Sequence, residues 1–226
     1  MGYSLATAIP VRSGAERATL VRRTYGLVFA GVLVTILGVA FGINQPNVMG
    51  AVAQHPFITF IAMIAPLWMV MRAPREYPKN LVLTGLFTFI SGVWLAPFLY
   101  LAERSAPGVV GEAGLMTFTA FGALSAYAVF SRRDFSAWGS FFMVGLVVLI
   151  VASLINMFVQ SVGAALWLSA GAVLIFSGLL VFDTWRLLRS GQFGSEDYVV
   201  TAVSIYLDLL NMFVAILSLL SGNRRN

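Results

Sequence analysis

Asp183 and Asp208 are the residues of this chain best placed to do chemistry, because each is a carboxylate inside apolar sequence. Both occur in the segment LLVFDTWRLLRSGQFGSEDYVVTAVSIYLDLLNMFVAILSLLSG, which runs from Leu179 to Gly222. A charged aspartate at the centre of a membrane helix costs about 2.5 to 3.5 kcal/mol on the insertion scale, so such residues usually pair or lie along an ion or proton path. The two aspartates are therefore the first functional candidates.

The two carboxyls are expected to lie close together. Asp183 comes six residues before Arg189, and Asp208 comes eleven residues after Asp197. At the helical rise per residue, they lie about 9 Å and about 16 Å from the polar segment that joins their helices. Adjacent antiparallel helices, with modest tilt, would bring them into contact. Two carboxyls in contact titrate as a coupled pair and can share a proton, so the pattern is typical of a pH switch.

The helix that carries Asp208 has one polar face. Its polar and small residues recur at spacings of three and four, which places them on one stripe. They are Thr201, Ser204, Asp208, Asn211, Ala215 and Ser218. We expect the stripe to face the bundle or a wet cavity. Interhelical hydrogen bonds of about 0.6 kcal/mol each are the simpler explanation for Ser204 and Ser218, whereas Asp208 is expected to serve function.

The composition identifies the elements that must position these residues as membrane helices. Hydrophobic residues make up 59% of the 226 residues and charged residues 10%, against about 25% charged in an average soluble domain. Runs of about 20 apolar residues span a bilayer core, and the sequence contains seven. They are Thr24 to Ile43, Pro56 to Met71, Leu81 to Leu101, Gly114 to Phe130, Trp138 to Phe158, Gly163 to Leu187, and Tyr198 to Leu220. The sequence therefore predicts an all-α polytopic membrane protein, with a polar segment over residues 1–23 and a seven-helix transmembrane domain over residues 24–221.

The basic residues predict the orientation of this bundle. Eleven of the 14 fall in the amino-terminal segment or in the connections after the second, fourth and sixth predicted helices, and three fall on the opposite side. The three are Arg104, Arg224 and Arg225. Because basic residues concentrate on the cytoplasmic side, we expect a cytoplasmic amino terminus and an external carboxyl terminus in a cell inner membrane. This distribution accounts for the net charge of +5 without nucleic-acid binding.

Two motifs resemble the Bax inhibitor-1 family of membrane proteins, and its bacterial members in particular. The segment FTAFGALSAYAVFSRRDFSAWGSFFMVGLVVLIVASLINMF is similar to the family's fourth and fifth helices, and FDTWRL with SIYLDLLNMF is similar to its carboxyl-terminal signature. The resemblance implies a seven-helix bundle in which Asp183 and Asp208 form a pH-sensing dyad that controls a calcium leak. Bacterial relatives include a partner and modulator of a membrane-bound ATP-dependent protease.

The resemblance also suggests roles for residues around the dyad. In relatives, a basic residue at the end of the second helix latches one aspartate, and Arg72 and Arg75 are the candidates here. Many relatives carry a glutamate inside that helix, whereas this chain has FIAMIAPLWMVM, with no acid. A cation path is expected to include Asp208, Asn211, Asn156 and Ser204, because hard cations prefer oxygen ligands. If calcium binds within the membrane, Asp183 and Asp208 are its expected ligands.

Two other functional classes fit part of the pattern. Intramembrane aspartyl proteases also place two aspartates on neighbouring helices. Those enzymes share the motif Gly-x-Gly-Asp at the second aspartate, whereas this chain has IYLD there. We therefore expect no enzyme activity and no cofactor, with calcium as the permeant or bound ion. The remaining alternative is an interaction protein that binds and modulates a membrane-bound protease without transporting ions, since small residues on several helices offer docking faces.

Overall fold

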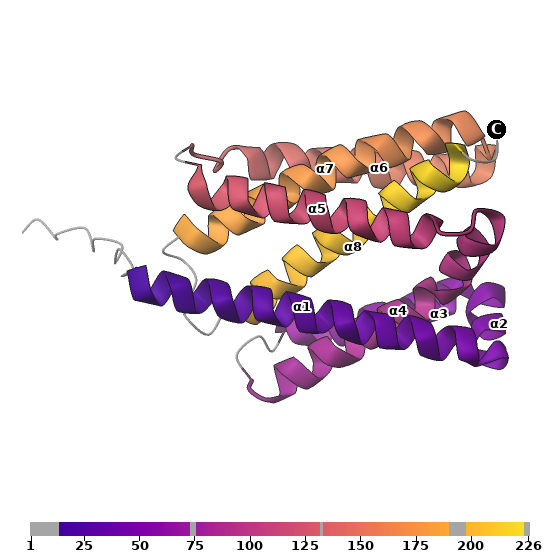
Figure 1. Cartoon of the computed structure of the whole chain (residues 1–226), viewed down its shortest axis with the longest axis horizontal. Helices are drawn as coiled ribbons and strands as arrows, with labels where there is room; N and C mark the ends of the chain where they lie inside the picture. Colours follow the sequence, from indigo (N-terminus) through magenta and orange to yellow (C-terminus); the bar gives the residue numbers. More distant parts are fainter. Residues whose placement is uncertain (1–13, 73–75, 132, 190–197, 224–226) are drawn as a thin grey trace, which may run out of the picture.

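A computed structural model describes residues 14–72, 76–131, 133–189 and 198–223, with the backbone alone for Gly14, Arg17, Arg189 and Asn223. The described residues form eight α-helices joined by short connections (Figure 1). The helices are α1 (Gly14–Asn44), α2 (Pro46–Gln54), α3 (Pro56–Arg72), α4 (Lys79–Ser105), α5 (Val109–Phe130), α6 (Trp138–Val159), α7 (Val162–Arg189) and α8 (Tyr198–Asn223). This part of the chain contains no strand, so the predicted all-α fold class is confirmed.

Six helices are long and apolar enough to cross a membrane, and the pair α2 and α3 makes a seventh span if it is counted as one bent element. The two helices meet at His55 with a bend of 102°. Each begins at a proline, which is favoured at the first position of a helix because it lacks the N–H that would be left unpaired there. The sequence analysis missed α2, because its nine residues are too few for a span and were read as a connection.

Helix α1 begins ten residues before the predicted first span, at Gly14 instead of Thr24. Leu20 in this extension is buried, as is Thr24 directly after it, while Arg22 and Arg23 are exposed. Long basic side chains at the end of a span can extend their charge to the membrane surface. The change from polar to apolar composition at residue 23 is therefore not the start of the helix.

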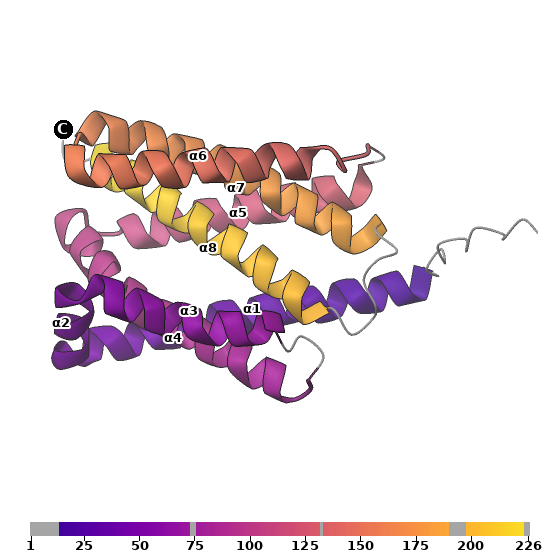
Figure 2. The ribbon, with the colours of Figure 1, turned by 180° about the vertical axis from the view of Figure 1, so that it is seen from behind.

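The helices alternate in direction and form two groups with α8 between them (Figures 1 and 2). Helix α4 packs against α1, α2 and α3, whereas α7 packs against α5 and α6. Helix α8 contacts α1, α4, α5 and α7, and it is the most buried of the six candidate spans. The predicted polar stripe on this helix thus lies inside the bundle, but apolar residues on its other faces are buried as well.

The alternation gathers described basic residues at one end of the bundle, the left end in Figure 1. Helices α1, α4, α6 and α8 begin there, and α3, α5 and α7 end there. The basic residues of these helix ends and connections are Arg22, Arg23, Arg72, Lys79, Arg133 and Arg186. Arg104 lies in the last turn of α4, at the opposite end. The grouping on which the predicted orientation rests is therefore present in the fold.

Helices α1 and α4 cross with their backbones in direct contact. A Cβ atom built on Gly38 would overlap the carbonyl oxygen of Phe89, and one built on Gly92 would overlap that of Thr35. Small residues at such a crossing let membrane helices approach closely, which gains dispersion contacts where the hydrophobic effect supplies none. The two glycines therefore allow the backbones of α1 and α4 to touch within the group formed by α1, α2, α3 and α4.

Large apolar side chains cover the outer faces of the bundle. Helix α6 is the clearest case, with only 6% of its span buried within the protein. Its exposed apolar residues include Phe141, Val144, Val148, Ile155 and Phe158. A surface of this kind is suited to contact with lipid tails, so the structure supports a membrane-embedded, multi-pass protein.

Candidate functional site

The two aspartate candidates are Asp183 on α7 and Asp208 on α8. Their carboxyl groups are close enough for their charges to interact. Asp208 is only 6% exposed, and its Oδ2 atom is buried with no hydrogen-bond partner among the described residues. Asp183 is half-buried. Helices α7 and α8 pack along each other, which keeps this aspartate dyad, defined as Asp183 and Asp208, inside the membrane-spanning part.

Arg186 is a basic residue in electrostatic range of Asp183. It follows Asp183 by one turn on α7, and its positive charge acts on that carboxylate. Thr184, the residue after Asp183 in the helix, is fully buried and hydrogen-bonds through Oγ1 to the hydroxyl of Tyr25 on α1, at 2.9 Å. This bond ties α7 to α1 beside Asp183. The dyad therefore sits where three helices, α1, α7 and α8, are held together.

The two predicted latch residues, Arg72 and Arg75, are not paired with the dyad among the described contacts. The guanidinium of Arg72 lies 3.7 Å from the centre of the Trp68 ring on its own helix, a cation–π contact. Helix α3 packs mainly on α4, and the described residues include no ion pair between Arg72 and either aspartate. Arg75 lies outside the described residues. Pairing of either arginine with the dyad thus stays a prediction.

Two of the predicted ion-path residues share a polar pocket beyond the dyad. The polar pocket has a volume of about 280 Å³ and lies between α6, α7 and α8. Its polar lining residues are Ser153, Asn156, Ser169, Asn211 and Ser218. Asn211 follows Asp208 by three residues, so Asp208 and the α8 residues of the polar pocket lie on the same stripe of this helix. Ser204 is half-buried on this helix but is not among the residues that line the pocket.

The pocket holds oxygen and amide groups in place without a cluster of acids. Asn211 donates from Nδ2 to the carbonyl of Leu207, at 2.8 Å, so its Oδ1 atom is turned away from that bond. The Oδ1 atom of Asn156 accepts a hydrogen bond from the backbone N–H of Ser161, at 3.2 Å. In the described ranges no group of three or more His, Cys, Asp or Glu side chains could hold a metal. A calcium ion at the dyad would therefore need amide, carbonyl or water oxygens to complete its six to eight ligands.

Comparison with known proteins assigns the family. The family model described as inhibitor of apoptosis-promoting Bax1 matches residues 17–226. The chain belongs to the Bax inhibitor-1 family. An uncharacterized membrane protein of Vibrio cholerae is 37% identical over 181 residues, covering 78% of this chain and 80% of that protein. Bax inhibitor 1 of Schizosaccharomyces pombe is 30% identical over 216 residues, covering 93% and 79% of the two chains. An uncharacterized protein of Campylobacter jejuni is 33% identical over 221 residues, covering 96% and 94%.

Membership of the Bax inhibitor-1 family confirms the resemblance carried by the motifs around the dyad. Within this family member, the structure adds three groups that the sequence analysis did not assign to the site. Arg186 was read as an orientation signal, although its spacing of three from Asp183 on a helix already indicates contact. Ser153 and Ser169 were not selected at all, because only the packing of α6 and α7 brings them beside Asn211.

One acidic residue of this Bax inhibitor-1 family protein has a structural role. The carboxylate of Glu103 accepts hydrogen bonds from the backbone N–H groups of Gly108, at 2.6 Å, and Val110, at 3.2 Å. These N–H groups lie at the start of α5, where the first donors of a helix have no partner within the helix. Glu103, in the last turn of α4, therefore caps α5.

Proposed function

We propose that this protein is a pH-sensitive cation leak, with calcium as the permeant ion, gated by the aspartate dyad. The observation that carries the proposal is the buried Oδ2 atom of Asp208, which has no hydrogen-bond partner in the described part of the chain. An ionisable group kept unpaired inside a membrane span lowers stability. Its retention beside a second carboxyl is explained if protonation of the pair controls a path.

The proposed gate works through the charge of the dyad. While the dyad is ionised, a basic side chain pairs with Asp183 and holds the helices together; Arg186 is in electrostatic range, and Arg72 is the candidate from α3. Acidification protonates the dyad, the basic side chain loses its charged partner, and the helices around Asp208 part. A leak of this kind runs down a gradient and needs no nucleotide.

The proposed path continues from Asp208 into the polar pocket. Amide and hydroxyl groups of Asn156, Asn211, Ser153 and Ser169 line that pocket, and oxygen ligands suit a hard cation. The path would then leave the membrane at the end where α6 and α8 end and α7 begins. We further propose that this end faces away from the cytoplasm of an inner membrane, because basic residues of the described helices concentrate at the other end.

Calcium flux into liposomes tests the proposal. Purified protein is reconstituted with a calcium-sensitive dye inside the vesicles, and flux is recorded at pH 6 and pH 8 for wild type, Asp183→Asn and Asp208→Asn. Asp134→Asn is the matched control, because Asp134 lies outside the spans and accepts a hydrogen bond from the Ser136 N–H that an asparagine oxygen can also accept. Flux in wild type and control should be higher at pH 6, Asp183→Asn should lose the pH dependence, and Asp208→Asn should lose the flux.

Two results would contradict the proposal. An unchanged pH profile in Asp183→Asn would remove the dyad from the gate. Absence of flux at both pH values, from protein shown to be folded by circular dichroism, would reject the leak itself. That second result would favour the other candidate, an interaction protein that modulates a membrane-bound ATP-dependent protease, for which the exposed apolar face of α6 offers a docking surface.

A further inference from the structure

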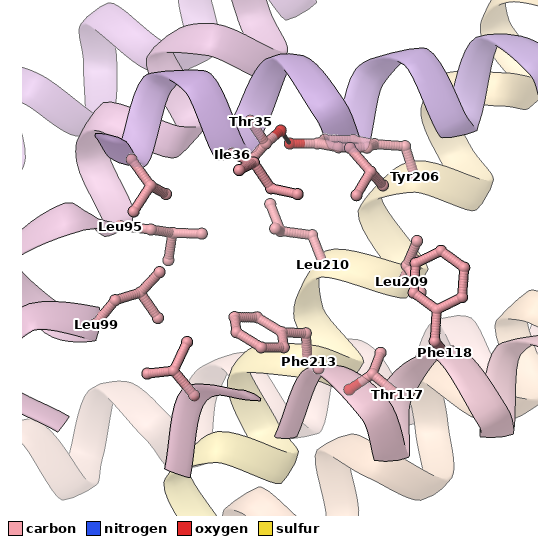
Figure 3. Close-up of a pocket in the computed structure, with 14 residues that line it drawn as sticks. Thr35, Ile36, Leu95, Leu99, Thr117, Phe118, Tyr206, Leu209, Leu210 and Phe213 are labelled. Atoms are coloured by element: carbon pink, nitrogen blue, oxygen red, sulfur yellow. Dashed lines mark hydrogen bonds between the residues drawn. The ribbon is translucent and has the colours of Figure 1, made fainter. Parts of the chain in front are cut away.

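A second cavity lies on the opposite side of α8 from the polar pocket (Figure 3). This apolar cavity has a volume of about 350 Å³ and lies between α1, α4, α5 and α8. Leu95 and Leu99 of α4 close one side of it, and Leu209 and Phe213 of α8 form its back. The residues involved are near the middle of α1 and α8, so the cavity lies within the membrane-spanning region.

The walls of the apolar cavity leave no polar group free to hold water. Its polar side chains are Thr35, Tyr206 and Thr117. A hydrogen bond of 2.7 Å joins the hydroxyl groups of Thr35 and Tyr206, and Thr35 also donates toward the carbonyls of Gly31 and Thr88. Thr117 donates to the carbonyl of Ala113, at 2.7 Å. Since an ordered water needs two to four polar partners and apolar cavities stay dry, this cavity is not suited to water.

The cavity opens toward the lipid between α1 and α5. Ile36 of α1 and Phe118 of α5 both line it, and they are 57% and 49% exposed. Helix α1 packs on α4 and α8, whereas α5 packs on α7 and α8, so α8 forms the floor between them. In a membrane, the medium next to this opening is the hydrocarbon of the bilayer.

We propose that the apolar cavity binds one hydrocarbon tail of a bilayer phospholipid. An engineered apolar cavity of about 150 Å³ holds benzene, so a volume of about 350 Å³ accommodates a longer stretch of chain. Side chains that face an empty space lose their dispersion contacts, and a tail restores those contacts at Leu95, Leu99 and Leu209. The interior offers no cation or free donor for a headgroup or a carboxylate. The polar headgroup of the lipid therefore stays outside the cavity, at the membrane surface, while the tail enters it.

A tail bound in the apolar cavity would contact α8, the helix that carries Asp208. Tyr206, Leu209, Leu210 and Phe213 line the apolar cavity, and Asp208 lies between the first two of them in sequence. A tail in the cavity thus supports the face of α8 that lies away from the polar pocket. The inference stands on the cavity alone and does not depend on cation flux.

Photolabelling in a bilayer tests the inference. The full chain is placed in nanodiscs that contain phosphatidylcholine with a diazirine at the end of one tail, and labelled residues are mapped by mass spectrometry. Leu95 and Leu99 are 3% and 7% exposed, so the surrounding lipid does not label them unless a tail enters. We expect label at these two leucines in wild type, together with label at exposed Phe141 of α6 as the positive control.

A filling substitution and a matched control make the test specific. Gly114 lines the apolar cavity, and a Cβ atom built there meets nothing within 4 Å. Gly114→Leu should fill the space and remove the label from Leu95 and Leu99 while Phe141 keeps its label. Gly122→Leu, on the same helix, also has open space at its Cβ and does not line the cavity, so it should label like wild type.

Three results would overturn the inference. The first is wild-type protein labelled at Phe141 but not at Leu95 or Leu99. The second is label at the two leucines that survives Gly114→Leu in folded protein. The third comes from an arm with a diazirine fatty acid in detergent: if it labels the leucines while the phospholipid in nanodiscs does not, the site takes a free apolar molecule instead of a bilayer tail.

Discussion

Gly92→Ala should destabilise the protein strongly, because it separates the closest pair of helices. In the structure, a Cβ atom on Gly92 would lie 2.9 Å from the Thr35 carbonyl carbon and 2.9 Å from the Val39 amide nitrogen, where ordinary contacts are 3.4 Å or more. It would also overlap the Thr35 carbonyl oxygen. All three atoms belong to the α1 backbone, so no side chain can rotate away. Helices α1 and α4 must then move apart along their whole contact.

The size of the effect follows from two opposed contributions. Overpacking typically costs about 1 to 3 kcal/mol, and rigid backbone on both sides of the contact favours the upper end. Replacing glycine by alanine within a helix regains about 0.5 to 1 kcal/mol. The net loss for Gly92→Ala is therefore about 2 kcal/mol, which lowers the melting temperature of a chain of this size by about 4 to 8 °C.

Gly85→Ala is the matched control for this experiment. Gly85 is also in α4, but a Cβ atom there meets nothing within 4 Å. Only the helix-propensity gain remains, so this variant should melt about 1 to 4 °C higher than wild type. Both variants are compared by thermal unfolding in one detergent, followed by circular dichroism. A Gly92→Ala variant that melts at or above the wild-type temperature would refute the argument from backbone contact.

Four further substitutions test other contacts of the structure. Tyr206→Phe should lower the free energy of unfolding by about 0.6 to 1.7 kcal/mol through loss of the bond to Thr35, and an unchanged denaturation midpoint in detergent would contradict this. Glu103→Ala removes the cap of α5 and should cost about 1 kcal/mol, seen as faster hydrogen exchange at the first turn of that helix; equal exchange would show that the cap is not needed. The positive charge of Arg186 favours the ionised state of the dyad. Arg186→Gln removes that charge, so the dyad becomes protonated at a higher pH and the pH midpoint of cation flux should move upward. Arg72→Gln should leave that midpoint unchanged if Arg186 alone acts on the dyad, and a shift caused by Arg72→Gln would restore the predicted latch.

The sequence was enough to predict the helices because each span must be apolar along its length. Six of the seven predicted spans lie within five residues of the observed helix at both ends, as for Trp138 to Phe158 against Trp138–Val159. Helix α2 escaped detection because its nine residues are too few to form an apolar run of spanning length. The start of α1 was misplaced because helical structure continues past the point where the residues become polar.

The candidate site was only partly predictable, since its geometry depends on how helices rotate and tilt. The proximity of Asp183 and Asp208 followed from two antiparallel neighbours with aspartates at similar depth. The shared pocket of Asn156 and Asn211 was not derivable in this way, because α6 reaches α8 only across α7. The position of Arg72 over Trp68 likewise depends on the rotamer that the side chain adopts on the surface of α3.

The glycine crossing of α1 and α4 has a consequence for how any motion of this protein is measured. Two helices whose backbones interlock at Gly38 and Gly92 cannot slide past each other without a steric barrier, so they form a stationary frame. By contrast, α6 meets α7 through aromatic rings laid over glycine, Phe142 on Gly178 and Phe182 on Gly139, and a flat ring can shift across a bare backbone. Spin labels placed on α1 or α4 would serve as the fixed reference, and changes in distance to labels on α6 and α7 would then report movement around the dyad directly.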